Sequence, residues 1–524
     1  MRRSLTVFVL ALLTVSAFAG KMNQQNDTRA ANAEGVIQTF SEQVSGHFDV
    51  EAYNAEQAAI HGLLTSRASH GATGLQFQPT QAQLDEIGRF NNCEDCSNGM
   101  RKLMVGFNMA SEESVNIQGS KFGERATEVS GGVLAPNRDG GYSWTTTVSS
   151  AGASAIRLHL SGFSLPQGAQ LFVYNEAGWV DGPYQGQGPN GNGDVWTGGV
   201  PGETVSVQIL FDGSVDGITS FNIQEVAHIG DEWVLPSLVE GVATEAFCSN
   251  NASCVEDASC HTQSATNGAR NGVAHILYSS GGSQYICSGG LLNDTDNSTQ
   301  RYWFLTANHC ISTSSEANSA SFYWQYKTSS CGGACFSPYT GSVPSTSGSS
   351  LVVTGSSSDF TLLECSQAPP GGSTLLGWSN SAVANSNGVN LYRISHPKGS
   401  PQAYSHHQVS TTKGTCGSWP RGAWIYEQDI TGATEGGSSG SPVLNSSGQV
   451  VGQLSGACGT NPQNPCASSQ NATVDGALAA YWNSVAPYLD PGSGPTCLPS
   501  GSNCNNNSDC CSGSCSGWFT TTCN

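Results

Sequence analysis

Three polar residues that are far apart in the chain each border a short apolar run typical of a buried strand. His309 lies near the end of FLTANHC (304–310), Asp359 opens DFTLLEC, and Ser439 lies in the glycine-framed EGGSSGSP. A serine hydroxyl attacks a carbonyl carbon readily only when a base takes its proton, and an imidazole oriented by a buried carboxylate is such a base. The order His, Asp, Ser therefore predicts acyl transfer through a catalytic triad.

The residues before Ser439 also suit the charge that develops during acyl transfer. The carbonyl oxygen becomes negative in the transition state and needs backbone N–H donors directed at it. Gly437 lies two residues before Ser439, and a glycine there lets the chain turn so that its N–H faces inward. We therefore expect the N–H groups of Gly437 and Ser439 to form an oxyanion hole.

Single histidines in such patterns have simpler interpretations. A lone histidine at a strand end is more often a core residue beside a disulfide than a base. The interpretation of His309 as a base therefore depends on the motifs of Asp359 and Ser439. His406 and His407 are adjacent in YSHHQ, and adjacent side chains of a strand point to opposite faces. We interpret these two as surface residues and not as a metal pair. The sequence implies no metal and no cofactor.

The composition limits the class of protein. A length of 524 residues predicts two to four domains, and only 11% of the residues are charged. Abundant glycine, serine, asparagine and threonine favour an all-β protein, with strands joined by polar turns. The net charge of −20 and the pI near 4.8, without a basic stripe, argue against nucleic-acid binding.

The first residues and the cysteines indicate export. MRRSLTVFVLALLTVSAFAG has two arginines, a short apolar run and the sequence Ala-Phe-Ala, which predicts a signal peptide over 1–19 and an exported chain from Gly20. No other run is long and apolar enough to predict a membrane span. Nineteen cysteines predict disulfides in an oxidising compartment, with at least one cysteine unpaired. We therefore expect a secreted, extracellular protein.

Composition and periodicity divide the exported chain into four parts. Residues 20–245 begin with partly helical sequence, and from about residue 140 the runs IRLHL, QLFVYN and TVSVQILF predict a β-sandwich. Residues 246–490 carry the three motifs on short strands and end in a predicted helix stopped by Pro491. A Gly/Pro-rich linker over 491–496 leads to a cysteine-rich tail over 497–524.

Four motifs in this order resemble those of the chymotrypsin-fold (trypsin-like) serine proteases: CSGGLL, LTANHC, DFTLL and GSSGSP. Within that fold, the chain also resembles the bacterial lysyl endopeptidases in the segments NNASCVEDASCH, VVGQLSG and YLDP. The resemblance is clearest after residue 250 and implies two six-stranded antiparallel β-barrels with a C-terminal helix over 246–490. It also implies peptide and protein substrates and a zymogen with a long pro-region, residues 20–245. We expect this pro-region to be required for folding, because a barrel dominated by non-local contacts folds slowly, and to block the active cleft until it is removed. Ser438 departs from the wider family, which often has aspartate there.

The resemblance also implies disulfides. By analogy, Cys287 pairs with Cys310, Cys254 with Cys458, and Cys260 with Cys331. Five cysteines of the same part have no assigned partner, namely Cys248, Cys335, Cys365, Cys416 and Cys466.

By the same resemblance, we expect the pocket that binds the residue before the scissile bond to be lined by Ala433, Thr434, Ser455 and Thr473. Lysyl endopeptidases have an aspartate where this chain has Thr473, and a neutral threonine cannot compensate a buried ammonium group. We therefore expect cleavage after neutral residues. The alternative, cleavage after lysine or arginine, depends on Asp475, which lies two residues further on the same face of the strand.

The tail resembles the inhibitor cystine knots. That resemblance implies the pairs Cys497–Cys511, Cys504–Cys515 and Cys510–Cys523, whereas spacing alone allows fifteen pairings. Trp518 and Phe519 are adjacent aromatic residues on a segment with little interior. They suit docking to a surface or glycan, or the packing of a protease-resistant end, and the sequence favours neither.

Two other functions compete with a secreted serine endopeptidase. The first is a catalytically inactive protease scaffold that binds or adheres through its tail. The second is an esterase with the same triad, which the His, Asp, Ser order disfavours because α/β-hydrolases have the order Ser, Asp, His.

Overall fold

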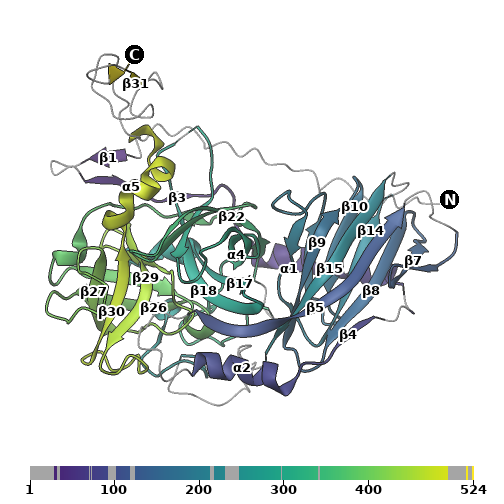
Figure 1. Cartoon of the computed structure of the whole chain (residues 1–524), viewed down its shortest axis with the longest axis horizontal. Helices are drawn as coiled ribbons and strands as arrows, with labels where there is room; N and C mark the ends of the chain where they lie inside the picture. The colour runs from purple at the N-terminus through teal and green to yellow at the C-terminus, as the bar shows by residue number, and fades with distance from the viewer. Residues whose placement is uncertain are drawn as a thin grey trace, which may run out of the picture.

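The computed structural model describes residues 29–31, 36–69, 71, 74–92, 102–118, 124–212, 217–230, 247–296, 298–339, 343–493, 515–516 and 522–523. Figure 1 shows a β-sandwich beside two packed β-barrels. The predicted signal peptide and at least one cysteine of each predicted tail disulfide lie outside the described residues. Of the tail, β31 (Cys515–Ser516) and β32 (Thr522–Cys523) pair antiparallel.

Two antiparallel sheets form the N-terminal sandwich. One sheet has the order β11-β10-β14-β8-β7-β6, with β4 parallel to β8, and the other runs β12-β9-β15-β5, with β13 on β9. Apolar residues of both sheets, such as Trp144 and Leu158, are fully buried between them. The strands are β4 (Leu75–Phe77), β5 (Leu103–Gln118), β6 (Thr127–Val129), β7 (Gly132–Pro136), β8 (Tyr142–Ser150), β9 (Ala155–Ser164), β10 (Ala169–Tyr174), β11 (Val180–Tyr184), β12 (Asp194–Trp196), β13 (Val200–Pro201), β14 (Thr204–Phe211) and β15 (Ile218–Ile229).

The sandwich begins earlier than the expected position near residue 140. Strands β5, β6 and β7 all precede it. The first five residues of β5, LMVGF, are all buried, and only the later ones alternate in exposure. A strand buried on both faces shows no alternation of apolar and polar residues, which is why the pattern did not reveal β5.

The first barrel is nearly closed, with the strand order β21-β20-β17-β18-β19-β23-β22. Strands β21 and β22 are separated by one residue, so they act as one bent strand. The strands are β17 (Val273–Ser280), β18 (Ser283–Leu292), β19 (Trp303–Ala307), β20 (Ser321–Tyr323), β21 (Ser345–Ser347), β22 (Ser349–Gly355) and β23 (Phe360–Cys365).

The second barrel is closed by six strands in the order β26-β25-β28-β29-β30-β27, because β27 also pairs with β26. β16 adds to β26. Two barrels followed by a helix confirm the predicted fold class. The strands are β16 (Glu256–Asp257), β25 (Asn390–Ser395), β26 (Ala403–Val409), β27 (Trp424–Thr431), β28 (Pro442–Leu444), β29 (Val450–Gly459) and β30 (Asn471–Ala477).

Within the described ranges, five α-helices lie around these sheets: α1 (Val50–Arg67), α2 (Gln81–Asn91), α3 (Ser264–Asn267), α4 (Ser314–Asn318) and α5 (Leu478–Leu489). Asp49 caps α1 by accepting from the Glu51 N–H at 2.9 Å. In α5, Leu478, Val485 and Leu489 are fully buried against the barrels. No helix among the described residues is long and apolar enough to cross a membrane.

The segment before α1 packs on the barrels. β3 (Glu42–Gln43) pairs with β24 (Thr374–Leu375), while β2 (Ile37–Thr39) pairs with β1 (Arg29–Ala31). The Gln449 amide, from the barrels, donates to the Thr39 carbonyl at 3.1 Å. The N-terminal part therefore contacts the barrels both through this segment and through the sandwich.

His159 forms an ionised cluster in the sandwich next to α4. Its ring hydrogen-bonds Asp194 at 2.5 Å and Glu225 at 2.9 Å, and the Asn318 amide of α4 donates to Asp194 at 2.9 Å. Burial lowers the pKa of His159, but the two carboxylates more than offset this effect and raise the pKa to about 9. The imidazolium therefore persists at neutral pH.

We expect the His159 cluster to make the protein less stable at alkaline pH. The pKa of His159 is raised above its ordinary value of 6.5, so its stabilisation is complete below that pH and is lost as the pH rises through about 9. The free energy of unfolding is measured in urea at pH 6, 8 and 10 in a Ser439→Ala chain. It should fall less with rising pH when His159→Gln is added than in the parent chain. His47 is exposed, and His47→Gln should keep the parental pH dependence. If the free energy of unfolding depends on pH in the same way in His159→Gln and His47→Gln, this role of His159 is contradicted.

Candidate active site

The turn after β19 brings His309 to the start of β23. Its Nδ1 lies 2.7 Å from Asp359 Oδ2, and its backbone N–H donates to Asp359 Oδ1 at 2.8 Å. Asp359 is 2% exposed and has φ +51°, a conformation held in part because its carbonyl accepts from the Asn308 N–H at 3.0 Å. Both carboxylate oxygens therefore face one histidine, and they fix the position of its ring.

Ser439 lies on the turn before β28, against β18 and β19. Its carbonyl accepts from the Ser288 N–H of β18 at 2.8 Å. A Cβ at the next residue, Gly440, would lie 2.8 Å from the Ala307 nitrogen at the end of β19, so the turn contacts the strand that leads to His309. The structure thus places the turn of Ser439 beside the end of β19, from which the chain continues to His309 and its partner Asp359.

Gly437 adopts a conformation that suits glycine. Its φ is +96°, and a Cβ there would lie 2.9 Å from the His396 carbonyl oxygen. Its own carbonyl accepts from the Ser288 hydroxyl at 2.8 Å, and its N–H bonds none of the residues that the structure describes. This N–H is therefore available to a ligand oxygen, as the oxyanion-hole prediction requires.

Glu435 connects the turn that carries Gly437 to the segment before β16. Its carboxylate, which is almost buried, accepts from the Asn251 amide at 3.0 Å and from the Ala252 N–H at 3.3 Å. Its carbonyl accepts from the Ser438 N–H at 2.9 Å and starts the turn. Sequence reasoning missed Glu435, because its partners lie about 180 residues earlier.

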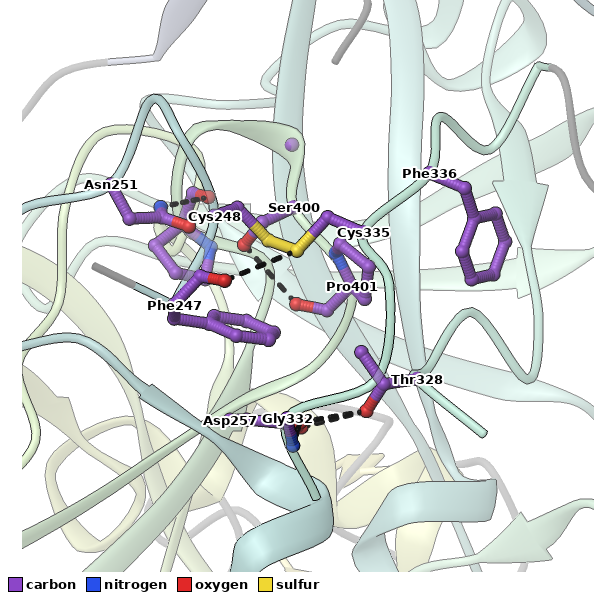
Figure 2. Close-up of a disulfide and its surroundings, with 12 residues drawn as sticks. Phe247, Cys248, Asn251, Asp257, Thr328, Gly332, Cys335, Phe336, Ser400 and Pro401 are labelled. Atoms are coloured by element: carbon purple, nitrogen blue, oxygen red, sulfur yellow. Dashed lines mark hydrogen bonds between the residues drawn. A yellow bond between two sulfur atoms is a disulfide. The ribbon is translucent and has the colours of Figure 1, made fainter. Parts of the chain in front are cut away.

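Figure 2 shows how the segment that holds Glu435 is itself fixed. Asn251 lies beside the disulfide between Cys248 and Cys335, and its N–H donates to the Cys248 carbonyl at 2.9 Å. A second disulfide, Cys254–Cys466, follows three residues later. Two covalent cross-links therefore anchor the residues that support the turn.

We expect Glu435 to act as a positioning residue for the oxyanion hole. Glu435→Ala should lower kcat for a small peptide substrate about tenfold or more, with little change in KM, which is less than the 10²–10³-fold loss for a deleted oxyanion donor. Glu435→Gln, whose amide oxygen can still accept from Ala252, should recover part of that loss. The half-exposed Glu256 gives the control Glu256→Ala. A rise in KM at constant kcat would show that Glu435 serves substrate binding instead.

Of the three disulfides expected in residues 246–490, the structure contains two, Cys287–Cys310 and Cys260–Cys331. The third differs, because Cys254 pairs with Cys466 and Cys458 pairs with Cys416. Cys458 packs in an apolar cluster with Trp419 and Trp424, next to the loop that carries Cys416. Of the cysteines left without partners, Cys248 and Cys335 pair with each other, and Cys365 is buried and free.

The sulfurs of Cys287 and Cys310 lie close to the His309 ring, a grouping of the kind that can bind a metal. The two sulfurs are joined to each other, so neither is a thiolate ligand. The bond instead ties the turn that carries His309 to β18.

The four expected pocket residues lie in the second barrel or just before the nucleophile. Ala433 is buried in a cluster with Val255 and Ala403, whereas Thr434 is partly exposed. Ser455 and Thr473 are buried on the neighbouring strands β29 and β30.

A buried ionic network behind Thr473 was not foreseen. Arg393, fully buried in β25, donates to Asp475 at 2.8 Å and to Glu427 at 3.1 Å, and its other nitrogen contacts the His407 ring at 2.9 Å. The opposite ring nitrogen of His407 lies 2.8 Å from Asp429. Interpreting His407 as a surface residue was therefore wrong. It alternates with the partly exposed His406 as expected, but its own face of β26 points into the barrel.

Burial shifts the pKa values of the acids in this network. The pKa of Glu427 rises to about 8 because of its burial and the neighbouring charge of Asp475, and burial raises the pKa of Asp475 to about 6. Burial also acts to raise the pKa of Asp429, but the hydrogen bonds from His407 and Thr473, together with the charges of His407 and Arg393, outweigh this effect and lower it. Asp475 is thus paired inside the barrel, whereas Asp429 accepts from the Thr473 hydroxyl at 2.7 Å and is slightly exposed.

Comparison with known proteins shows which proteins the chain resembles. Residues 248–472 match the family described as lysyl endopeptidase, C-terminal domain. The chain is 29% identical over 372 residues to the lysyl endopeptidase of Pseudomonas aeruginosa, across 67% of this chain and 76% of that protein. The resemblance to the lysyl endopeptidases is confirmed. These matches support a serine endopeptidase, the enzyme class expected from the sequence.

Three solved structures show a weak likeness to parts of the chain. The Rv3671c protease of M. tuberculosis in its inactive form has a TM-score of 0.28 and 14% identity, covering 45% of this chain and 97% of that one. The HtrA-type protease AlgW with a tripeptide has a TM-score of 0.30 and 13% identity, covering 44% and 63%. A scabies mite inactivated protease paralogue has a TM-score of 0.31 and 13% identity, covering 44% and 98%.

Proposed function

We propose that the protein is a secreted serine endopeptidase, made as a zymogen, that hydrolyses peptide bonds through His309, Asp359 and Ser439. The observation that carries the proposal is the 2.7 Å contact between His309 Nδ1 and Asp359 Oδ2, at the place where the Ser439 turn meets β18 and β19. The sequence relative, a lysyl endopeptidase, supports the same class.

In the first half of the reaction, Ser439 Oγ attacks the peptide carbonyl while its proton passes to His309 Nε2. Asp359 keeps the other ring proton on Nδ1 and stabilises the imidazolium that forms. The N–H groups of Gly437 and Ser439 bind the carbonyl oxygen as it becomes negative. His309 then gives its proton to the leaving amine, and an acyl-enzyme remains.

Water completes the cycle by the same route. His309 takes a proton from a water molecule, whose oxygen attacks the acyl carbon, and then returns the proton to Ser439. The oxyanion donors act a second time.

A fluorophosphonate probe, which reacts with activated serines, tests the proposal. The processed protein should be labelled, and Ser439→Ala should not. Ser441→Ala, a buried serine two residues away, is the matched control and should keep the labelling. An unlabelled, correctly processed protein would favour the alternative of an inactive protease-fold protein that binds or adheres.

We infer a preference for cleavage after neutral residues. Thr473, opposite Ala457 on β29, is neutral, and Asp475 is paired with Arg393 inside the barrel. One observation favours the alternative of lysine or arginine: Asp429, bonded to Thr473, has a lowered pKa and stays ionised. Profiling on a peptide library separates the two. Cleavage only after basic residues that is lost in Asp429→Asn, but kept in Asp475→Asn, would establish the alternative.

The remaining parts of the chain take supporting roles in this proposal. Residues 1–19 direct secretion, and residues 20–245 act as a pro-region that assists folding. The tail over 497–524 either docks the enzyme on a surface or glycan or protects its end. Cutting the chain after Asp490 distinguishes these roles, because loss of activity only on insoluble substrate would indicate docking.

A further inference from the structure

Residues 37–44 lie in an extended conformation along one edge of the barrels. β3 pairs antiparallel with β24. Towards one end of this stretch, the Thr39 N–H donates to the Trp378 carbonyl at 2.9 Å, and at the other end the Val44 N–H donates to the Ser373 carbonyl at 2.8 Å. In Figure 1, β3 lies with the barrels and not with the sandwich that the chain goes on to form. The stretch is therefore an added strand on the barrels.

We call residues 372–380, which face this added strand, the edge segment. On its inner side, the Leu376 N–H donates to the Leu291 carbonyl of β18 at 2.9 Å, and the Asn293 N–H donates to the Leu376 carbonyl at 2.9 Å. Its outer side bonds residues 37–44. Without those residues, the outer N–H and carbonyl groups would form an open edge, and an open edge pairs readily with another extended chain.

Barrel side chains hold the main chain of the added strand and not its side chains. The Gln449 amide donates to the Thr39 carbonyl at 3.1 Å, and the Asn293 amide donates to the Phe40 carbonyl at 2.9 Å. Asn293 is fully buried, and Gln449 is nearly so. Any extended chain offers such carbonyl groups, so these bonds give affinity without requiring a particular sequence.

A glycine lets the bound chain approach the edge segment closely. A Cβ at Gly377 would lie 2.5 Å from the Thr39 carbonyl oxygen and 2.6 Å from the Phe40 carbonyl carbon. Of residues 37–44, only Thr39 and Val44 are buried, whereas Phe40 is 55% exposed. The site therefore requires a small residue at the position of Thr39 and an apolar one at that of Val44, and it constrains the other positions less.

The edge segment and the turn that carries Ser439 pack against the same residue of β18. A Cβ at Gly290 would lie 3.3 Å from Leu376 Cδ1 and 2.8 Å from Pro442 Cγ, and Pro442 follows Ser439 by three residues. The edge segment contributes no residue to the proposed triad or to the oxyanion turn. A chain held at the edge segment is therefore bound apart from the cleft but near it, which raises its effective concentration at the cleft.

We propose that the processed enzyme binds an extended segment of its polypeptide substrate along residues 372–380, at a second site outside the cleft. This inference rests on the proposed function, in which residues 20–245 are a pro-region that is removed. A second copy of the processed chain would lack residues 37–44, so it does not offer this strand. A polypeptide substrate does, because its extended or unfolded stretches present the same main-chain groups together with small and apolar side chains.

The first test needs no activity. A recognition sequence for a site-specific protease is inserted after the exposed His47 in the full exported chain carrying Ser439→Ala. After cutting, an excess of a fluorescent peptide of residues 36–46 should replace the released N-terminal piece. By fluorescence anisotropy, it should bind the cut chain at least about tenfold more tightly than the uncut chain. Release of the N-terminal piece without binding of the peptide would overturn the proposal whether or not the protein is an enzyme.

Changes in both partners locate the contact. Gly377→Ala in the cut chain places a methyl group against the bound main chain and should weaken binding of the peptide about tenfold or more. A Cβ at Gly414 would meet no atom within 4 Å, so Gly414→Ala is the matched control. Unchanged binding in a folded Gly377→Ala protein would contradict the assigned edge.

Modified peptides test the same contact if Gly377→Ala does not fold. N-methylation at Thr39 removes the N–H that donates to Trp378, whereas the Phe40 N–H bonds none of the described residues. The peptide methylated at Thr39 should therefore bind more weakly than the one methylated at Phe40. Equal binding of the two peptides would contradict the assigned edge.

The second test uses the processed enzyme with Ser439 intact. The peptide of residues 36–46 should raise KM for an unfolded, carboxymethylated protein and should not compete with a small peptide substrate. In Gly377→Ala, the ratio of kcat/KM for the unfolded protein to kcat/KM for the small peptide should fall about tenfold, and Gly414→Ala should keep the parental ratio. An unchanged ratio in Gly377→Ala would overturn the substrate as the occupant. An enzyme that hydrolyses neither substrate would refute the proposed function, while the binding result would still stand.

Discussion

Replacing Asp359 with asparagine should lower kcat for peptide hydrolysis by about 10⁴-fold, the loss known for the equivalent change in another serine-protease triad. The reason lies in the two hydrogen bonds of the carboxylate. Oδ1 accepts from the His309 backbone N–H at 2.8 Å, so an asparagine must place its amide oxygen there. Its NH₂ group then faces Nδ1, 2.7 Å away in the parent, where only a lone pair can accept. The ring proton moves to Nε2, and His309 can no longer accept the proton of Ser439.

Both kcat and KM for a small peptide substrate, measured on processed enzyme, check this prediction. KM should change little, because Asp359 is buried and touches no substrate. Asp139 is exposed and pairs with Arg67, so Asp139→Asn is a matched control that should keep full activity. A kcat for Asp359→Asn within tenfold of the parent would mean that another group orients His309.

The motifs proposed to be catalytic could be picked out from the sequence because each is local. His309, Asp359 and Ser439 each follow or precede an apolar strand within a few residues, and the chemistry requires these residue types in the same neighbourhood. Gly437 was readable for the same reason, since a residue two positions before a nucleophilic turn needs a conformation that glycine adopts readily. The barrels that bring these motifs together were expected from the family resemblance, not from the pattern of the strands.

What the sequence did not reveal depends on pairings between distant segments. Cys254 reaches Cys466 because of the path of the loop between β29 and β30, and no spacing rule gives that path. Glu435 acquires its role from residues about 180 positions earlier. The start of β5 has no alternating pattern because neighbouring side chains are buried in different apolar clusters, Val105 in one and Met104 in another. In each case the deciding partner lies on another sheet or loop.

The fate of Asp475 illustrates the same limit. From the sequence it was the residue on which basic specificity would depend, because it shares a face with Thr473. The face was assigned correctly, but β25 places Arg393 opposite it, and the carboxylate pairs inside the barrel. The residue that contacts Thr473 is Asp429, from β27. A strand pattern gives the side on which a residue lies, whereas its partner depends on the order of strands in the barrel.

Arg393→Met should destabilise the folded protein by about 3–5 kcal/mol, the cost of leaving buried carboxylates without their cation. Arg393, Glu427 and Asp475 are fully buried, and the guanidinium donates to both acids. Methionine has a similar length but no charge, so the acids must either take up protons or repel each other. Urea unfolding in a Ser439→Ala chain, which cannot digest itself, measures the loss. Arg301, half-exposed in a surface pair with Glu364, gives the control Arg301→Met, which should cost less than about 1 kcal/mol.

The pH dependence distinguishes loss of charge compensation from loss of packing. Glu427 has its pKa raised from 4.5 to about 8, so its contribution is complete below pH 4.5 and is lost as the pH rises through about 8. Without Arg393, both acids should keep their protons to higher pH, so the destabilisation should shrink toward pH 5 and grow toward pH 9. Adding Glu427→Gln and Asp475→Asn to Arg393→Met should restore stability at neutral pH and remove this dependence. If the triple variant stays as unstable as Arg393→Met at every pH, the guanidinium acts through its shape and not through its charge.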